Sequence, residues 1–145
     1  NLAAQVDPRN PEVQALLAEA RKRHEATRAE REMDVAAKAE DNHDYAAAAE
    51  AYRAASAIDP SNARAAFKAA QCMQRLGQEP KDIRLFAQRA VELEPRNADH
   101  QALLGAVLTE LGMKKLGQKH LQEALQLDND HPEAKKILKK GRWPF

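Results

Sequence analysis

A short turn sequence that recurs through the chain constrains the fold more than any other feature. Each full copy has an apolar residue, an acid, a proline and, two residues after the proline, an asparagine. The apolar residue ends one helix, the acid and proline stop it, and the asparagine is suited to cap the next helix. Three copies, and a weaker fourth with Asn129 in place of the proline, occupy residues 6–11, 58–63, 93–98 and 127–132. The sequence therefore predicts helices joined by short turns.

The distances between these turns indicate an internal repeat. The prolines at positions 8, 60 and 95 and Asn129 are separated by 52, 35 and 34 residues. A period near 34 residues is typical of tetratricopeptide repeats, each of which is a helix–turn–helix unit. The first interval equals one repeat plus 18 residues, so the array is preceded by an extra segment.

Small and large residues inside the repeats follow the same pattern. Ala48 and Tyr52 reproduce an A-x-x-x-F element, Leu104 and Gly105 reproduce an L-G pair, and alanines recur late in each second helix. On these residues, the chain resembles the tetratricopeptide family over about residues 29–131. The resemblance implies an all-α, right-handed α-solenoid of antiparallel helix pairs. The chain departs from the family pattern because no Trp opens a repeat, and because the middle repeat is one residue longer, within residues 77–81.

The predicted organisation has five parts. Residues 1–28 are the end of an upstream element and a leading helix, and the chain, which begins at Asn1 without Met, reads as a segment of a larger protein. The three repeats span 29–62, 63–97 and 98–131. Residues 132–145 form a basic capping helix and a tail, since arrays need a polar-backed terminal helix.

The leading segment has no partner helix in the sequence. Neither Gly nor Pro occurs between residue 12 and Asp41, which predicts one long helix over about 11–40. Val13, Leu16, Leu17 and Ala20 give its front an apolar face. This front half is expected to protrude, to pack on an upstream element, or to pair with another copy. An alternative function is therefore oligomerisation, or docking onto other domains of the parent protein, through residues 11–28.

Composition excludes several classes of protein. Net charge is +1, so the whole chain has no strong attraction to nucleic acid or membranes, and no apolar stretch reaches the length of a membrane span. The single cysteine, Cys72, excludes an internal disulfide and suits a reducing, cytoplasmic compartment. The Ala- and Arg-rich composition fits bacterial multidomain proteins with appended repeat arrays.

No catalytic or metal-binding constellation is present in the sequence. Phosphate-binding glycine loops and zinc-protease motifs are missing, and none of the five histidines is paired with a second ligand at metal-site spacing. Cys72 is interpreted as a buried structural thiol, and His43 and His131 are expected to be exposed in turns. We therefore predict a protein that is not an enzyme and that needs no cofactor.

The resemblance also implies where a partner binds. In this family the first helices of successive repeats line a concave groove. The positions that face it here give an apolar floor and a basic centre, which predicts a peptide or protein partner with an apolar anchor and acidic flanks. The predicted groove residues are Met33, Ala37, Arg64, Phe67, Lys68, Gln71, Arg75, Ala102, Leu103 and Ala106.

Two other partners are considered. The carboxylate clamp that grips acidic chaperone tails needs Lys and Asn at positions held here by Met33 and Ala37, and Asp99 occupies a later clamp position. Such a clamp is disfavoured, because Met and Ala offer no donor to a carboxylate. The C-terminal helix could instead bind nucleic acid or an acidic surface, because charge is combined there with an aromatic residue. That basic patch comprises Lys135, Lys136, Lys139, Lys140, Arg142 and Trp143.

Overall fold

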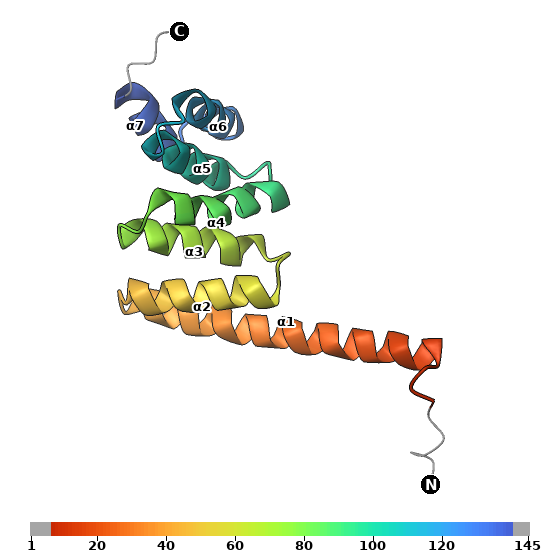
Figure 1. The fold of residues 1–145 in the computed structure, drawn as a ribbon. Helices are drawn as coiled ribbons and strands as arrows, with labels where there is room; N and C mark the ends of the chain where they lie inside the picture. Colours follow the sequence, from red (N-terminus) through yellow and green to blue (C-terminus); the bar gives the residue numbers. More distant parts are fainter. Residues whose placement is uncertain (1–6, 141–145) are drawn as a thin grey trace.

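The computed structural model describes residues 7–140, which fold into seven α-helices without a strand (Figure 1). The predicted all-α class, the long leading helix and the capping helix are confirmed. The helices are α1 (Pro11–Asp41), α2 (Tyr45–Ile58), α3 (Ala63–Arg75), α4 (Pro80–Leu93), α5 (Ala98–Glu110), α6 (Lys114–Leu127) and α7 (Pro132–Lys140).

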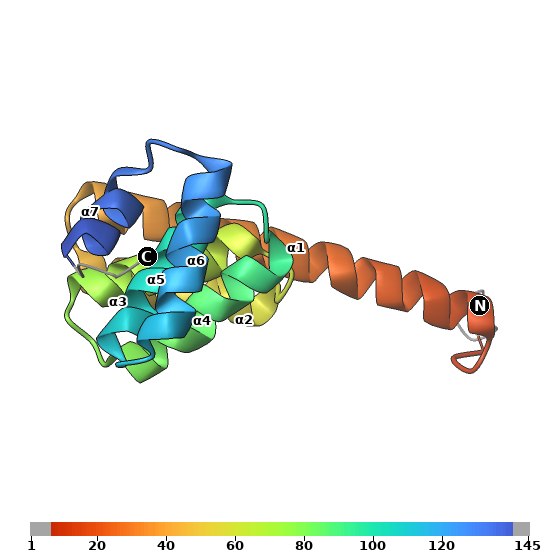
Figure 2. The same ribbon diagram turned by 90° about the horizontal axis from the view of Figure 1, so that it is seen from above.

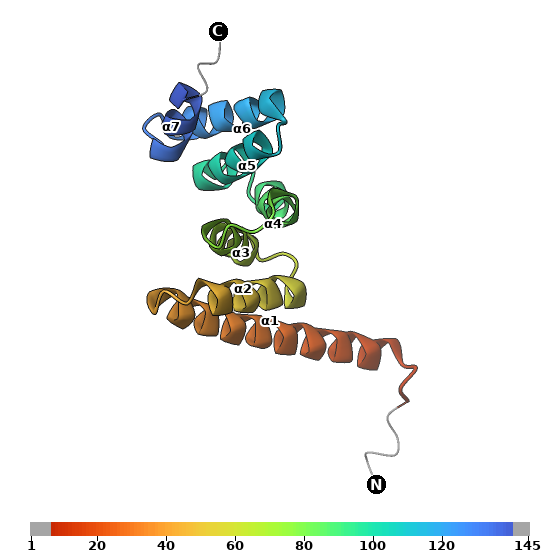
Figure 3. The ribbon, with the colours of Figure 1, turned by 60° about the vertical axis from the view of Figure 1, so that its left-hand side comes forward.

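The helices stack in chain order. Each helix packs against the next one along the chain, and α7 also contacts α5. Figure 3 shows the resulting column, with α3 and α7 toward one side of the stack and α4 and α6 toward the other. The seven helices are consistent with three helix pairs and a cap, the arrangement of a tetratricopeptide solenoid.

Asparagine side chains begin three of the helices, as the turn sequence predicts. Asn10 accepts the Glu12 amide at 2.9 Å, Asn62 accepts the Ala65 amide at 3.0 Å, and Asn97 accepts the Asp99 amide at 3.0 Å. These bonds satisfy amides that have no partner within their own helix.

In the fourth turn, a histidine takes the place of the capping asparagine. His131 Nδ1 accepts the Ala134 amide at 3.3 Å, and His131 Nε2 donates to Asp99 Oδ1 at 2.9 Å. His131 is 6% exposed, so the expectation that it faces solvent is wrong. His43 is exposed, with a positive φ of 61° in the turn between α1 and α2.

Small residues allow the paired helices to approach closely. The buried core is dominated by alanine, and large side chains such as Tyr52, Met73 and Leu121 fill the spaces between helices. The closest approach joins α5 and α6, where a Cβ on Gly105 would lie 2.6 Å from Leu121 Cγ, and one on Gly117 would lie 2.8 Å from the Gly105 carbonyl oxygen. Glycine is therefore required at this crossing.

Helix α1 is continuous over 31 residues, and its front half projects beyond the stack (Figures 1 and 2). At 1.5 Å per residue it is about 45 Å long. Ala29 and Ala36 are its buried residues, whereas Leu16 and Leu17 are 66% and 47% exposed. The front half protrudes from the stack of the single chain, and packing on an upstream element or pairing with another copy stays a prediction.

Some predicted features lie outside the described residues. These are residues 1–6, in the segment predicted to include the end of an upstream element, and the C-terminal tail with Arg142 and Trp143. Within residues 7–140, no helix is both long and apolar enough to cross a membrane.

Candidate peptide-binding groove

Two adjoining hollows lie between α3, α5 and α7. The first, of about 190 Å³, is lined by polar and charged side chains from all three helices, together with Phe67 and Leu103. The second, called the apolar hollow, has a volume of about 250 Å³ and contains the apolar side chains of Ala106 and Ile137. Its other lining residues are Gln74, Thr109, Glu110, Glu133, Lys136 and Lys140. Gln74 and Glu133 line both hollows, so together they form one groove with a polar part and an apolar part.

The predicted groove residues of α3 divide into two groups. Phe67, Lys68 and Gln71 line the polar hollow. Arg64 is exposed near the start of the helix. Arg75 lies over the Tyr45 ring at 4.9 Å and donates to Tyr45 Oη at 2.9 Å, so it is held against α2.

Lys68 is also engaged within the protein. Its Nζ donates to the two carboxylate oxygens of Glu40 at 3.0 and 3.3 Å, and Tyr52 Oη donates to the same carboxylate at 2.8 Å. Burial raises the pKa of Glu40, but the hydrogen bonds from Tyr52 and Lys68 outweigh it and hold this pKa below its ordinary value. The predicted basic centre is thus partly neutralised by α1.

The predicted residues of α1 and α5 are more buried than a binding floor would be. Met33 and Ala37 are half-buried, and Met33 packs against the main core. Ala102 is fully buried among the core residues of α5, α6 and α7, so its side chain is not part of the groove surface. Leu103 and Ala106 are only 3% and 4% exposed, but they line the polar and the apolar hollow, respectively.

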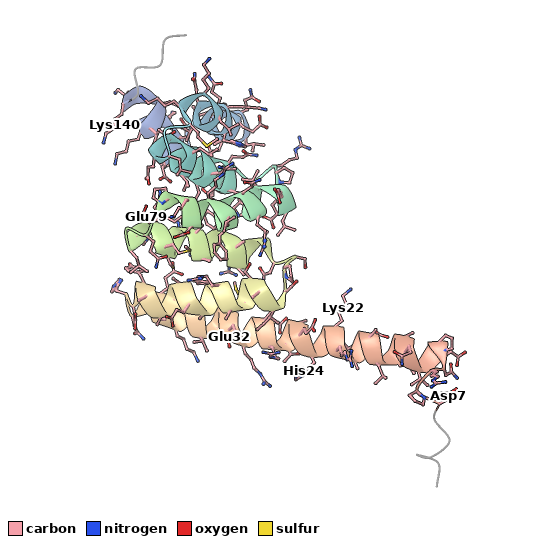
Figure 4. All side chains as sticks on the ribbon, in the orientation of Figure 1. Asp7, Lys22, His24, Glu32, Glu79 and Lys140 are labelled. Carbon is pink, nitrogen blue, oxygen red and sulfur yellow. The ribbon has the colours of Figure 1, made fainter. Side chains whose placement is uncertain are left out.

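The capping helix brings part of the predicted basic patch into the groove. Lys136 and Lys140 line the apolar hollow together with Ala106, whereas Lys139 is exposed outside it. Lys140 is labelled near the end of α7 in Figure 4. Lys135 pairs instead with Asp130, at 2.6 Å. Two regions that the sequence treats as separate sites therefore meet in one surface.

Sequence reasoning missed several residues that line the groove. These residues are His131, Glu133 and Ile137. The available signal is that α7 follows a fourth turn copy, so it can continue the row of groove-lining helices. The position of His131 before Pro132 matches that of the capping asparagine Asn10 before Pro11, which indicates a capping role for its ring.

Neither a metal-ligand cluster nor an exposed thiol is found among the described residues. No group of three His, Cys, Asp or Glu side chains is placed to hold a metal ion in residues 7–140. Cys72 is 1% exposed, and burial raises the pKa of its thiol.

Comparison of whole sequences identifies no relative: the chain matches no protein-family model and no curated protein. Comparison of structures gives a different result, with 114 chains of solved structures matching. The comparison of structures therefore detects a similarity to known proteins that the comparison of sequences does not.

Three of the matching structures serve as examples. The MamA protein matches with a TM-score of 0.69 and 24% identity over 76% of this chain, which spans 60% of the MamA chain. The TPR domain of Arabidopsis OM64 matches at 0.73 and 18% identity over 81% of this chain and 97% of that domain. The second TPR domain of human RPAP3, in complex with the HSP70 peptide SGPTIEEVD, matches at 0.72 and 20% identity over 85% and 99%. The chain thus has the tetratricopeptide-repeat fold.

Proposed function

We propose that this chain is a non-catalytic protein–protein interaction scaffold that binds a peptide in the groove between α3, α5 and α7. The observation that carries the proposal is the apolar hollow bordered by Lys136 and Lys140. A side chain of the partner would enter between Ala106 and Ile137. An acidic residue beside it would pair directly with Lys136 or Lys140, the two bases of a hollow that also contains the acids Glu110 and Glu133. The lone buried thiol of Cys72 supports a cytoplasmic location within this proposal.

The expected affinity is modest. Complete burial of one aliphatic side chain contributes about 1.5–3 kcal/mol. Two or three anchors, less the cost of ordering the peptide, correspond to dissociation constants of roughly micromolar size.

A chaperone-type acidic tail is a poor fit to this groove, although the RPAP3 domain carries such a peptide. Met33 and Ala37 replace the donors that a carboxylate clamp needs, and the Asp99 carboxylate lies in the polar hollow, hydrogen-bonded to His131. A peptide carboxylate placed there would meet a like charge. We therefore propose that acidic residues of the partner lie beside α7 instead.

Selection of peptides from a random library would test the groove. We expect sequences with an aliphatic anchor next to acidic residues, and a dissociation constant raised about tenfold by Lys136→Glu. Lys139→Glu is a matched control, since Lys139 is on the same helix but outside the hollow. Equal effects of the two reversals would show general charge attraction rather than binding in the groove. If neither reversal changes the dissociation constant of the selected peptides, the groove is not their binding site.

Nucleic acid is a weaker candidate for the basic patch. Lys135 is paired with Asp130, and Lys136 and Lys140 share their hollow with Glu110 and Glu133, so the lysines do not form an uninterrupted positive surface. Phosphate binding depends on such surfaces. Titration with a fluorescent single strand at low salt is expected to show no saturable binding.

A further inference from the structure

We propose that the front half of α1 pairs with the same segment of a second copy of this chain, with the two helices antiparallel. The proposal goes beyond the groove and does not depend on it. It assigns an occupant to an apolar face of α1 that no other described helix covers.

The segment carries a row of apolar side chains that is open to solvent. This row, the front stripe, consists of Val13, Leu16, Leu17 and Ala20. Leu16 and Leu17 are 66% and 47% exposed, and the whole of residues 14–28 is exposed. Residues three and four apart lie on one face of a helix, so the stripe forms a continuous surface.

The front stripe faces away from the rest of the molecule. Ala29 and Ala36 mark the side of α1 that is buried, and Lys22 lies on that side too, where it lines a hollow with the turn that follows α2. At about 100° per residue, Ala20 falls on the opposite side from Ala29, and His24 falls on the side of Ala20. Figure 4 shows Lys22 on the side of the stack and His24 on the other side. A second helix can therefore lie along the stripe without meeting α2.

The charges favour a second copy and an antiparallel arrangement. Residues 11–20 contain two acids and no base, whereas residues 21–28 contain four bases and one acid. When the two front stripes lie against each other, antiparallel pairing brings Glu12 of each copy next to the basic run that begins at Arg21 of the other copy, whereas parallel pairing places acid beside acid and base beside base. Opposite charges beside an apolar seam select partner and orientation in paired helices. One acid, Glu19, already bonds Arg23 within the helix at 2.6 Å, in an exposed pair that can exchange partners.

A second copy explains the segment better than a membrane surface does. The front stripe contains no aromatic residue, and two of its flanking charges are the acids Glu12 and Glu19. Helices that lie in a membrane interface carry bulky apolar residues opposite a basic face. We therefore treat binding to anionic vesicles as an outcome that would contradict the proposal.

Sedimentation of the full chain at increasing concentration tests the pairing. We expect the mass to rise from 16.1 kDa toward twice that value. The double substitution Leu16→Glu and Leu17→Glu should weaken association at least ~10-fold, because it places four charges in the seam. Leu85→Glu is the matched control, because Leu85 is 70% exposed on α4 and should not affect the mass. Circular dichroism would verify that each variant keeps its helices.

Two results would overturn the pairing, and neither bears on the groove. One is a chain that stays monomeric at every concentration, with or without binding to anionic vesicles. The other is association that survives the Leu16→Glu and Leu17→Glu changes. A monomeric variant that still binds groove peptides would separate the two proposals.

Cross-linking through single cysteines tests the orientation. Val13→Cys and His24→Cys place thiols near the two ends of the exposed face, while native Cys72 is too buried to react. In an antiparallel pair, a mixture of the two variants should form the mixed disulfide faster than either variant links to itself. Preferential self-linking of each variant would establish a parallel pair and reject the arrangement.

Discussion

Helices α5 and α1 differ in how much of each helix is buried. In α5, all nine residues from His100 to Leu108 are buried, because α4, α6 and α7 all pack against it. In α1, two residues of 31 are buried, and α2 is the helix against which it packs. Both segments are nevertheless regular helices. Figure 1 shows the contrast between the enclosed α5 and the projecting α1.

The difference separates what makes a helix from what stabilises a repeat array. Helix formation in the front of α1 follows from local features: the Asn10 cap, Pro11 in the first turn, and a long run without Gly or Pro. Stability of an array comes from the interfaces between neighbouring helices. The C-terminal end should therefore respond strongly to substitution, and the front of α1 should hardly respond.

The largest effect is expected at Leu121, which is fully buried in the core of α5, α6 and α7. Leu121→Ala should lower the free energy of unfolding by about 2–5 kcal/mol, because it removes buried methyl groups and leaves a cavity. Urea denaturation measures the loss. Leu85→Ala, at a position 70% exposed, is expected to change it by less than about 0.5 kcal/mol. Similar losses for both variants would mean that burial does not govern stability here.

A smaller effect is expected where α5 and α6 cross. Gly117→Ala would place a Cβ 2.5 Å from Thr109 Oγ1 and 2.8 Å from the Gly105 carbonyl oxygen. Overpacking of this kind costs about 1–3 kcal/mol, which should exceed the gain of about 1 kcal/mol that alanine brings to a helix interior. Thermal unfolding should show a lower midpoint for Gly117→Ala and an unchanged one for Lys115→Ala, an exposed control on α6. An increased midpoint would show that α5 and α6 can separate without cost.

The sequence predicts this end of the fold well because its signals are local. Each turn contains its own stop and cap, and the 34-residue interval fixes the order of the helices. The fourth turn, which lacks the capping asparagine, is capped in the same way, since His131 occupies the asparagine position and caps α7. That substitution could not be foreseen, because an imidazole is buried here through a partner 32 residues away, Asp99.

The groove is less predictable because it depends on contacts between helices. The positions taken from the family resemblance include Phe67 and Gln71, which line the hollow, but they do not reveal that Ala102 is core or that Lys68 is bonded to Glu40. Lys136 and Lys140 could be recognised as basic but not as neighbours of Ala106, since α7 folds back onto α5. Contacts between helices decide which of these residues are buried, bonded or adjacent, and no local sequence pattern predicts those contacts.

The hydrogen bonds around Glu40 predict a dependence of stability on pH at the N-terminal end. Because the pKa of Glu40 is below its ordinary value of 4.5 in the folded protein, its contribution is present above that pH and is lost as the pH falls through the folded pKa. Glu40→Gln should cost about 1 kcal/mol at pH 7, and the difference from the wild type should shrink in acid. Urea denaturation at several pH values measures this. Glu30→Gln, at an exposed position of the same helix, should show no such trend, and a constant difference for Glu40→Gln would reject the assignment.

The smallest effect compares one kind of cap at the two ends of the molecule. Asn97 and Asn10 both accept helix amides, at 3.0 and 2.9 Å. Asn97→Ala should lower the free energy of unfolding by about 1 kcal/mol, because α5 unfolds only with the stack. Asn10→Ala should change it by less than about 0.5 kcal/mol, because the front of α1 can fray while the packed helices stay folded. Hydrogen exchange, measured below the concentration at which copies pair, should instead show faster exchange confined to residues 11–21. Equal losses for the two variants would mean that α1 unfolds as one unit with the stack, and the contrast between the two ends would then be one of exposure alone.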